Sequence, residues 1–514
     1  MTKTAVIAIP RLEPHQPPPG PAIVARICAN LGHDVTVYDL NIKMFNEFVN
    51  HRYDFYALDE FFNYNASITE EQRQLIDKFT DHWAREITSK NYDYLMIGIF
   101  SIVSHWYGRY LIERLKTLNC QAKIIIGGMG VGTFDLVTPE KSFGHVMLAE
   151  KLIDTFIIGE AEVALVKYFN GDSSPGINNN EIDQIQDLDD LPRPDYSYFN
   201  LDEYNYIIQN EKEVYITGSR GCVRKCTYCD VERFWPKYRY RSGSSVASEM
   251  ISNYEKFGVT RFYFTDSLVN GSLKVFDQMC NQLANYKFDK PISWSGQFIF
   301  RTKKTIPKDH FATIAAAGGK LFYVGIETGS DRVRKEIGKN FTNDDIDFQL
   351  EECSQHGIKI VPLMFSGYLT ETIQDHEENL KAFTRWKKYV ANGVIEAIDL
   401  GTELVILPGA PVERMIGSHG IDFLLDSSGS PMLHMWEARS NPDLTIRERI
   451  RRKVELHTEA IRNSWPVWRH ASRLSDLRSR ILTHNLHLQD PKTFYEIKST
   501  ENSSNKYVIP IRAA

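Results

Sequence analysis

The N-terminal part of the chain alternates short apolar runs with amphipathic stretches of helical length. Such runs predict strands that are buried on both faces, as in a parallel sheet covered by helices. Strands are expected at residues 4–9, 34–38, 94–100, 123–126 and 156–158, and helices at 21–31 and 107–118. The pattern predicts a doubly wound α/β domain of flavodoxin-like kind, which binds ligands beyond the carboxyl ends of its strands.

A second alternation of strands and helices follows further along the chain. Its expected strands are residues 213–217, 261–264, 292–294, 321–325, 358–361 and 404–407. Six strands with helices between them predict a second parallel α/β domain and suit the partial (β/α)6 TIM-like barrel that the family resemblance given below implies. The functional residues of such a barrel gather at the carboxyl ends of its strands.

The composition changes outside these two regions. Residues 41–91 form an aromatic-rich, helical insertion that either covers the first domain or walls a ligand channel. Residues 170–190 are rich in Gly, Asn, Ser, Asp and Pro, which is typical of a linker. We therefore expect an α/β domain at 1–170, a linker at 171–210, a barrel at 211–411 and a mainly helical, specificity-determining region at 412–514.

Composition and charge narrow the class of protein. The 514 residues are 42% hydrophobic and 25% charged, and the formal net charge is -6, so nothing global favours nucleic acid or an anionic membrane as partner. No apolar run is long enough to cross a bilayer, and no secretory signal is recognised. We expect a cytoplasmic protein without transmembrane segments.

Three of the seven cysteines, Cys222, Cys226 and Cys229, lie within eight positions directly after the first barrel strand. Thiolates are soft ligands for iron–sulfur clusters, zinc or copper(I). A structural zinc site normally has four ligands, so three leave a position open for a substrate or cofactor. A zinc site or an inert structural role stays open as an alternative, whereas a disulfide does not suit the scattered remaining cysteines.

The run Cys-x3-Cys-x-Tyr-Cys resembles the signature of the radical S-adenosylmethionine (SAM) superfamily, with Tyr228 as its aromatic residue. The resemblance implies a [4Fe-4S] cluster on the three cysteines, whose free iron is chelated by SAM. It further implies that reduction, by an external donor such as flavodoxin or ferredoxin, cleaves SAM to a 5′-deoxyadenosyl radical.

The same resemblance assigns SAM-binding roles to three residues at barrel strand ends. Asp266 is expected to accept a hydrogen bond from the SAM amino group, and Arg301 to meet the carboxylate or ribose region. Glu327, in a Gly-Ile-Glu-Thr-Gly-Ser run close to the family's own, is expected to hold ribose hydroxyls. The alternatives are a helix-capping Asp266, a solvated Arg301 and a structurally paired Glu327.

The N-terminal domain resembles the cobalamin-binding type that precedes many radical SAM barrels. The likeness rests on Pro-Pro-x-Gly20, on Leu-Gly-His-x-Val-x-Val-x-Asp39 and on the later Gly-Gly turn. It implies a corrin contacted by Ser101, Ser104, Gly127 and Gly128. The family's cobalt-ligating histidine motif is incomplete, because Gly20 stands two places too far from His15; His15 is either a cobalt ligand or an ordinary loop residue.

Cations and tryptophans mark the C-terminal region. The run Arg447 to Lys453 contains five cations, which form either a solvated helix face or a receptor for an anionic substrate group. Trp436, Trp465 and Trp468 either line a pocket or fill a core.

The resemblance implies an enzyme that methylates an unactivated carbon of a small-molecule or peptide substrate with the help of cobalamin. One alternative keeps the radical chemistry for rearrangement, cyclisation or epimerisation, with a cobalamin-free N-terminal domain. Another is a non-catalytic cobalamin or redox sensor. The sequence does not identify the substrate.

Overall fold

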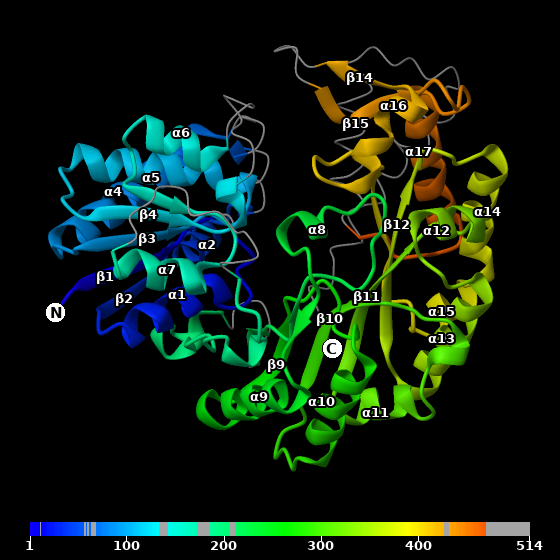
Figure 1. Cartoon of the computed structure of the whole chain (residues 1–514), viewed down its shortest axis with the longest axis horizontal. Helices are drawn as coiled ribbons and strands as arrows, with labels where there is room; N and C mark the ends of the chain where they lie inside the picture. Colours follow the sequence, from blue (N-terminus) through cyan, green and yellow to red (C-terminus); the bar gives the residue numbers. More distant parts are fainter. Residues whose placement is uncertain are drawn as a thin grey trace. The chain divides into compact units, whose positions relative to one another are not determined.

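The computed structural model describes residues 1–468, except positions 11, 56–57, 59–60, 63–67, 133–141, 172–183, 205–210 and 426–430. The chain forms two compact units, Met1–Tyr215 and Ile216–Ala514 (Figure 1). No helix in the described part of the chain is long and apolar enough to span a membrane.

The first unit is built on a five-stranded parallel sheet. Its strands are β1 (Lys3–Ala8), β2 (Asp34–Asp39), β3 (Tyr94–Gly98), β4 (Lys123–Gly127) and β5 (Thr155–Ile157). Their order is β2-β1-β3-β4-β5, which is the flavodoxin-like order predicted from the sequence. The order reverses between β1 and β3, so the general rule for such sheets predicts a ligand site beyond the carboxyl ends of these two strands.

Helices cover both faces of this sheet, which is why its strands are apolar throughout. One core joins α1 (Pro19–Asn30) and α7 (Ala161–Phe169) to the sheet through Val6, Met96 and Ile125. The opposite face carries α4 (Glu70–Ser89), α5 (His105–Thr117) and α6 (Phe143–Ala149) (Figure 1). The described part of the 41–91 insertion is helical, with α2 (Leu40–Asn50) followed by α4 packed on α5.

The expected linker at 171–210 is described only over 184–204, where it packs against the first unit. Short 3-10 turns at Leu188–Asp190, Tyr196–Tyr198 and Leu201–Tyr204 bury apolar side chains. The Tyr204 hydroxyl donates to Asp39 Oδ2 at the carboxyl end of β2, at 2.5 Å. This part of the segment therefore belongs to the first unit.

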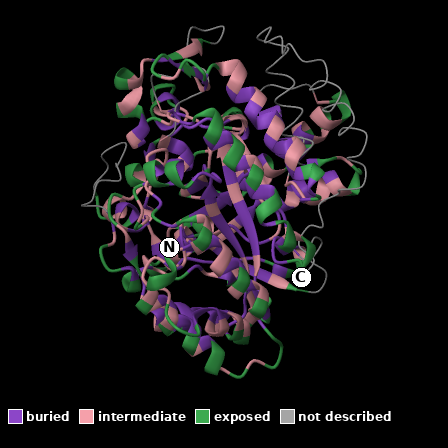
Figure 2. Cartoon of the chain, turned by 90° about the vertical axis from the view of Figure 1, so that its right-hand side faces the viewer, coloured by how far each residue is buried: buried purple, intermediate pink, exposed green. Residues whose placement is uncertain are grey.

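The predicted partial barrel begins with β6, whose last residue is the first of the second unit, and its other strands lie in that unit. Its six strands are β6 (Lys212–Ile216), β9 (Val259–Phe264), β10 (Ser293–Phe298), β11 (Gly319–Glu327), β12 (Lys359–Ser366) and β13 (Asp399–Glu403), in consecutive order. Neighbours from β9 to β13 are parallel. Figure 2 shows these strands largely buried, while many helical residues are exposed.

The helices of the barrel pack against its outer face. They are α9 (Gly243–Phe257), α10 (Leu273–Asn285), α11 (His310–Ala316), α12 (Asp331–Ile337), α13 (Asn343–His356), α14 (Ile373–Arg385) and α15 (Lys387–Ala391). Trp294, Phe276 and Phe322 form edge-to-face contacts between the strands and α10. The alternation of apolar residues along each strand reflects this packing.

The predicted position of the sixth strand, at residues 404–407, is wrong. The strand is β13, at Asp399–Glu403, and the apolar run follows it as irregular chain. Leu404 and Ile406 are buried in a hydrophobic cluster that includes Trp436, and Leu404 O accepts a hydrogen bond from Trp436 Nε1. The run is therefore apolar because the C-terminal region covers it.

The C-terminal region contains an antiparallel hairpin as well as helices. The hairpin, β14 (Ile421–Leu425) with β15 (Pro431–Ala438), follows the short α16 (Ile416–His419), and the long α17 (Ile446–Arg462) comes after it. The sequence predicted the helical character but not the hairpin. Residues 469–514 lie outside the described part.

The interpretation of the Arg447–Lys453 run as a solvated helix face is also wrong for three of its five cations. Arg449, Arg452 and Lys453 are buried, with at most 2% of their surfaces exposed. Arg449 lies over the Trp436 ring at 3.6 Å, and Arg452 pairs with buried Glu371 at 2.9 Å. Trp436 and Trp465 fill the core, and Trp468 stacks on Tyr323.

Candidate active site

The three cysteines are carried by one closed loop at the carboxyl end of β6. The short strand β7 (Ser219–Arg220) pairs with β8 (Arg239–Tyr240) and ties the two ends of the loop together. Gly221 has φ +84°, and a Cβ there would lie 2.6 Å from Lys237 O, so the loop closes only with glycine at this position. The loop thus presents Cys222, Cys226 and Cys229 as one group.

Three barrel segments hold the middle of this loop. Thr227 N donates to Ile337 O at 3.0 Å, and Val412 N donates to Thr227 O at 2.7 Å. The Thr227 hydroxyl also bonds with the Tyr368 hydroxyl at 2.9 Å. Cys226 lies in the same hydrophobic cluster as Ile337. Contacts within the protein therefore fix the position of the middle of the loop.

The environment of the thiols suits metal-bound thiolates. Burial raises the pKa of all three cysteines, that of Cys226 to about 12, while the positive charge of Lys339 lowers each of them. Arg224 N donates to Cys222 Sγ at 3.3 Å. A buried thiol with N–H donors and nearby positive charge becomes a stable thiolate when a metal replaces its proton.

The donor set fits an iron–sulfur cluster better than a single ion. In a [4Fe-4S] cluster each cysteine binds a different iron, so the sulfurs surround a cube rather than one point. Within the described ranges, no three His, Cys, Asp or Glu side chains converge on one metal ion. The three thiols nevertheless lie close enough to influence one another's pKa.

Tyr228 and Glu327 meet beside the cysteine loop. The Tyr228 hydroxyl donates to Glu327 Oε1 at 2.7 Å, and the Lys339 ammonium donates to the same oxygen at 2.7 Å. Glu327 is 6% exposed and has φ +68°, a strained backbone conformation for a residue other than glycine. Lys339 was not predicted from the sequence, because the whole of α12 separates it from Glu327.

Asp266 holds the backbone that leads into the loop. It lies at the carboxyl end of β9 and accepts hydrogen bonds from Ser219 Oγ at 2.6 Å and from Gly218 N at 2.9 Å. Burial raises the pKa of Asp266 to about 7, against the lowering effect of these bonds. Both observed partners belong to the protein, so the predicted contact with a SAM amino group stays a prediction.

One nitrogen of the Arg301 guanidinium is hydrogen-bonded to the protein, whereas another has no such partner among the described residues. Its Nη2 donates to the carbonyls of Asn270 at 2.5 Å and Gly271 at 3.0 Å. Its Nε is buried and has no hydrogen-bond partner among the described residues. Burial lowers the pKa of Arg301, followed by repulsion from Arg224. A buried guanidinium with an unused donor fits an anionic group such as a carboxylate.

Tyr238 interacts electrostatically with Asp266, Cys222 and Arg301, and it was not predicted as a site residue from the sequence. Burial, together with the charges of Asp266 and Cys222, raises its pKa to about 12. The charge of Tyr238 in turn raises the pKa of Arg301, against the lowering effect of burial. The structure therefore brings the cysteine loop, Asp266 and Arg301 to the same carboxyl edge of the barrel, and Glu327 joins them through Tyr228.

In the first unit, the four residues predicted for corrin binding lie at the carboxyl edge of the sheet. Ser101 and Ser104 follow β3, Gly127 is the last residue of β4, and Gly128 follows it. Ser104 is fully buried and its Oγ has no hydrogen-bond partner among the described residues. His15 lies 3.4 Å from Glu13, an ion-pair partner that also suits an ordinary loop histidine.

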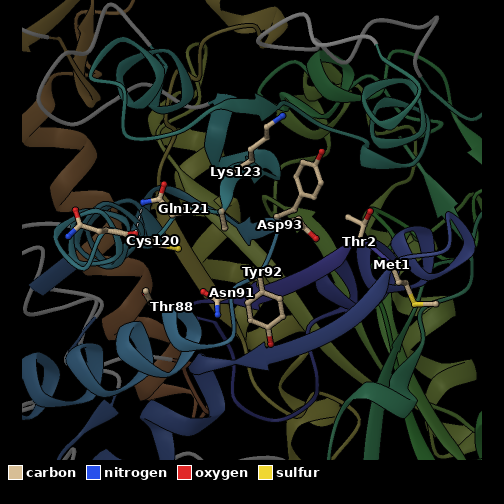
Figure 3. Close-up of a pocket in the computed structure, with 12 residues that line it drawn as sticks. Met1, Thr2, Thr88, Asn91, Tyr92, Asp93, Cys120, Gln121 and Lys123 are labelled. Carbon is tan, nitrogen blue, oxygen red and sulfur yellow. Dashed lines mark hydrogen bonds between the residues drawn. The ribbon is translucent and has the colours of Figure 1, made fainter.

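A surface hollow of this unit lies at the opposite edge of the sheet. It is lined by residues at the starts of β1, β3 and β4, including Thr2, Asp93 and Lys123 (Figure 3). None of the residues predicted for cofactor binding lines it. In doubly wound sheets, ligands bind at the carboxyl edge, so this hollow is not the predicted site.

Comparison with protein families identifies the barrel. The family model for the radical SAM superfamily matches residues 216–383, the range that contains the cysteine loop, Asp266, Arg301 and Glu327. This chain contains a radical SAM domain. Such a domain uses a [4Fe-4S] cluster and SAM, as the resemblance of the cysteine run implied, and the radical SAM assignment makes the protein an enzyme.

Two curated relatives are each about a quarter identical in sequence to this chain over the stretch that aligns. An uncharacterized methyltransferase of Pyrococcus horikoshii is 24% identical over 62% of this chain and 71% of its own length. An anaerobic magnesium-protoporphyrin IX monomethyl ester cyclase of Rubrivivax gelatinosus is 25% identical over 40% of this chain. This match spans only 37% of the cyclase, so the reaction of the cyclase is not assigned to this chain.

The fold extends the likeness beyond the radical SAM domain. A radical SAM methyltransferase from Kitasatospora setae, solved with tryptophan substrate and a SAM analogue, covers 89% of this chain with a TM-score of 0.63 and 15% sequence identity. Another structure of the same methyltransferase contains cobalamin and a [4Fe-4S] cluster, with a TM-score of 0.60. At this identity, the comparison establishes the shared fold.

Proposed function

We propose that the protein is a cobalamin-dependent radical SAM methyltransferase acting on an unactivated carbon of a small-molecule or peptide substrate. The observation that carries the proposal is the convergence of the cysteine loop, Glu327 and Arg301 at the carboxyl edge of a radical SAM domain. When bound, the cluster and SAM supply a 5′-deoxyadenosyl radical that removes substrate hydrogen, and cobalamin supplies the methyl group.

The residues of the chain bind and orient these groups. The thiolates of Cys222, Cys226 and Cys229 would hold the [4Fe-4S] cluster. Arg301 Nε donates to the SAM carboxylate, for which it has an unused, buried N–H. Both hydrogen bonds that Glu327 accepts from the described residues end on Oε1, so Oε2 receives the ribose hydroxyls. Asp266 keeps Gly218 and Ser219 in place beneath the loop.

Cobalamin is proposed for the carboxyl edge of the first unit. The buried hydroxyl of Ser104, which has no hydrogen-bond partner among the residues that the structure describes, supports this placement, since a buried polar group is rarely left without a partner. The reversal of strand order between β1 and β3 puts a ligand crevice at the same edge. We propose flavodoxin or ferredoxin as the external electron donor.

A second candidate keeps the SAM radical for a rearrangement, cyclisation or epimerisation and leaves the first unit free of cobalamin. It is favoured by the packing of Gly128 and Gly130, since a Cβ on either would fall within 3 Å of the Ile99–Ser101 backbone. Close backbone packing therefore explains why glycine stands at these two positions, without any role for a corrin.

Anaerobic reconstitution tests the cofactor assignment. The wild-type chain, supplied with iron, sulfide and hydroxocobalamin, should hold about four irons and show corrin absorbance. Cys222→Ala, Cys226→Ala and Cys229→Ala should each lose the cluster spectrum, whereas Cys120→Ala, a matched change outside the loop, should keep it. A cluster without corrin absorbance would support the cobalamin-free candidate.

The reaction is tested with SAM under reducing conditions. We expect release of 5′-deoxyadenosine and, with a substrate, a gain of one methyl group by mass spectrometry. A chain that binds the cluster but releases no deoxyadenosine would favour the sensor hypothesis over an enzyme. A modified substrate with unchanged mass would favour rearrangement or epimerisation over methylation.

A further inference from the structure

Lys339 occupies a buried position between the cysteine loop and Glu327. It follows α12 and Gly338, and only 7% of its surface is exposed. Its ammonium donates to Gly325 O at 2.6 Å and to Glu327 Oε1 at 2.7 Å. A buried ammonium is retained only where acceptors replace its water shell, and this one has a carbonyl and a carboxylate.

The barrel strand is shaped to admit this ion pair. A Cβ on Gly325 would lie 2.1 Å from Glu327 Oε1 and 2.4 Å from Lys339 Nζ. The strand also shifts register between Gly325 and Glu327, where Glu327 takes its positive φ. The glycine of the Gly-Ile-Glu run therefore provides the space in which the lysine reaches the carboxylate.

The segment that carries Lys339 also contacts the cysteine loop. Ile337 O accepts the hydrogen bond from Thr227 N, in the middle of the loop. A Cβ on Gly338 would lie 3.2 Å from Lys225 O and 3.7 Å from Cys226 Cα, which shows how closely the two backbones approach. The ammonium acts electrostatically on all three thiols from this position.

We infer that Lys339 is a positioning residue that raises the reduction potential of the cluster on Cys222, Cys226 and Cys229 and fixes Glu327 for SAM. The inference rests on the proposed function. Reduction adds one electron to the cluster, and a buried positive charge beside it favours the reduced, more negative state. The same charge holds Glu327 in one orientation, so that Oε2 is presented to the ribose.

The test is a redox titration of the reconstituted protein, monitored by electron paramagnetic resonance. Lys339→Met should disfavour one-electron reduction about tenfold, which lowers the midpoint potential by about 59 mV. It should also weaken SAM binding about tenfold, or about 1.4 kcal/mol. Lys339→Arg should remain near wild type, and so should Lys335→Met, an exposed lysine of α12.

A second comparison covers the case in which Lys339→Met does not fold. Glu327→Gln removes the partner charge, so the shift between Glu327→Gln and Glu327→Gln/Lys339→Met isolates the effect of the ammonium. An unchanged potential in either comparison, with the cluster at wild-type occupancy, would overturn the inference but leave the proposed function intact. A wild-type chain that assembles no cluster would overturn both.

Discussion

At the residue scale, two buried carboxyl groups of the barrel are stabilised by different means. Glu327 faces an ammonium and a phenol, whereas Asp266 accepts hydrogen bonds from neutral donors in the backbone and Ser219. Burial disfavours the ionised form of Asp266 more than its neutral partners favour it, which raises its pKa to about 7. Asp266 thus couples the stability of the barrel to pH.

This coupling predicts the pH dependence of Asp266→Asn. Because the pKa is raised on folding, the stabilisation by Asp266 is full below the unfolded value of 3.8 and is lost as the pH rises through about 7. Between pH 5 and pH 8, wild type should lose on the order of 2 kcal/mol relative to Asp266→Asn. Urea unfolding of the cluster-free proteins measures this, and a pH-independent difference would contradict it.

At the element scale, the turn after β4 is fitted to the chain that follows β3. Gly128 has φ +114°, and a Cβ there would lie 2.6 Å from Ile99 O. Ile99 N donates to Gly127 O at 2.7 Å, and Gly130 N donates to Ile99 O at 3.0 Å. The two loops that the sequence assigned to a corrin therefore support each other, and their shape depends on glycine.

Gly128→Ala should destabilise this edge of the sheet. The strained φ and the clash together should cost about 2–4 kcal/mol. Gly32→Ala provides the control, because Gly32 has φ +83° but open space around a Cβ, so only about 1 kcal/mol is expected. Hydrogen exchange of β3 and β4 for Gly128→Ala, and of α1 for Gly32→Ala, measures the two costs; equal losses would contradict the packing argument.

At the scale of the second unit, α17 joins the C-terminal region to the barrel through buried cations. Arg449 donates to the carbonyls of Leu404 at 2.7 Å and Trp436 at 2.9 Å. Arg452 pairs with Glu371, which also accepts from Gly367 N at 3.1 Å at the end of β12. The bonds link β12, β13 and β15 to one helix, so the region outside the family core is built into the barrel.

Removing one partner of the Arg452–Glu371 pair should cost more than removing both charges. Arg452→Met leaves a buried, unpaired carboxylate and should destabilise the unit by about 3–5 kcal/mol. Arg452→Met/Glu371→Gln should recover most of this loss, because the amide oxygen of glutamine still accepts from Gly367 N. Thermal unfolding of the three proteins tests the prediction, which fails if the double variant is no more stable than Arg452→Met.

The sequence by itself determined the features that depend on local pattern. The spacing of Cys222, Cys226 and Cys229 is set within one loop, so it predicted their common site without knowledge of the fold. The apolar runs of β1 to β5 and β6 to β12 predicted strands because each is buried by helices on its own flanks. The same alternation of strands and helices predicted the doubly wound α/β class of the first unit.

Only the tertiary structure decided which distant groups meet. An apolar run has the same pattern whether a neighbouring strand or a tryptophan buries it, so residues 404–407 were mistaken for β13. Charged residues predict a solvated face, but Arg449 and Arg452 find acceptors on elements that come earlier in the chain. Lys339 meets Glu327 across α12, through space that Gly325 provides. Ion pairs of this kind depend on the packing of elements, which local sequence does not encode.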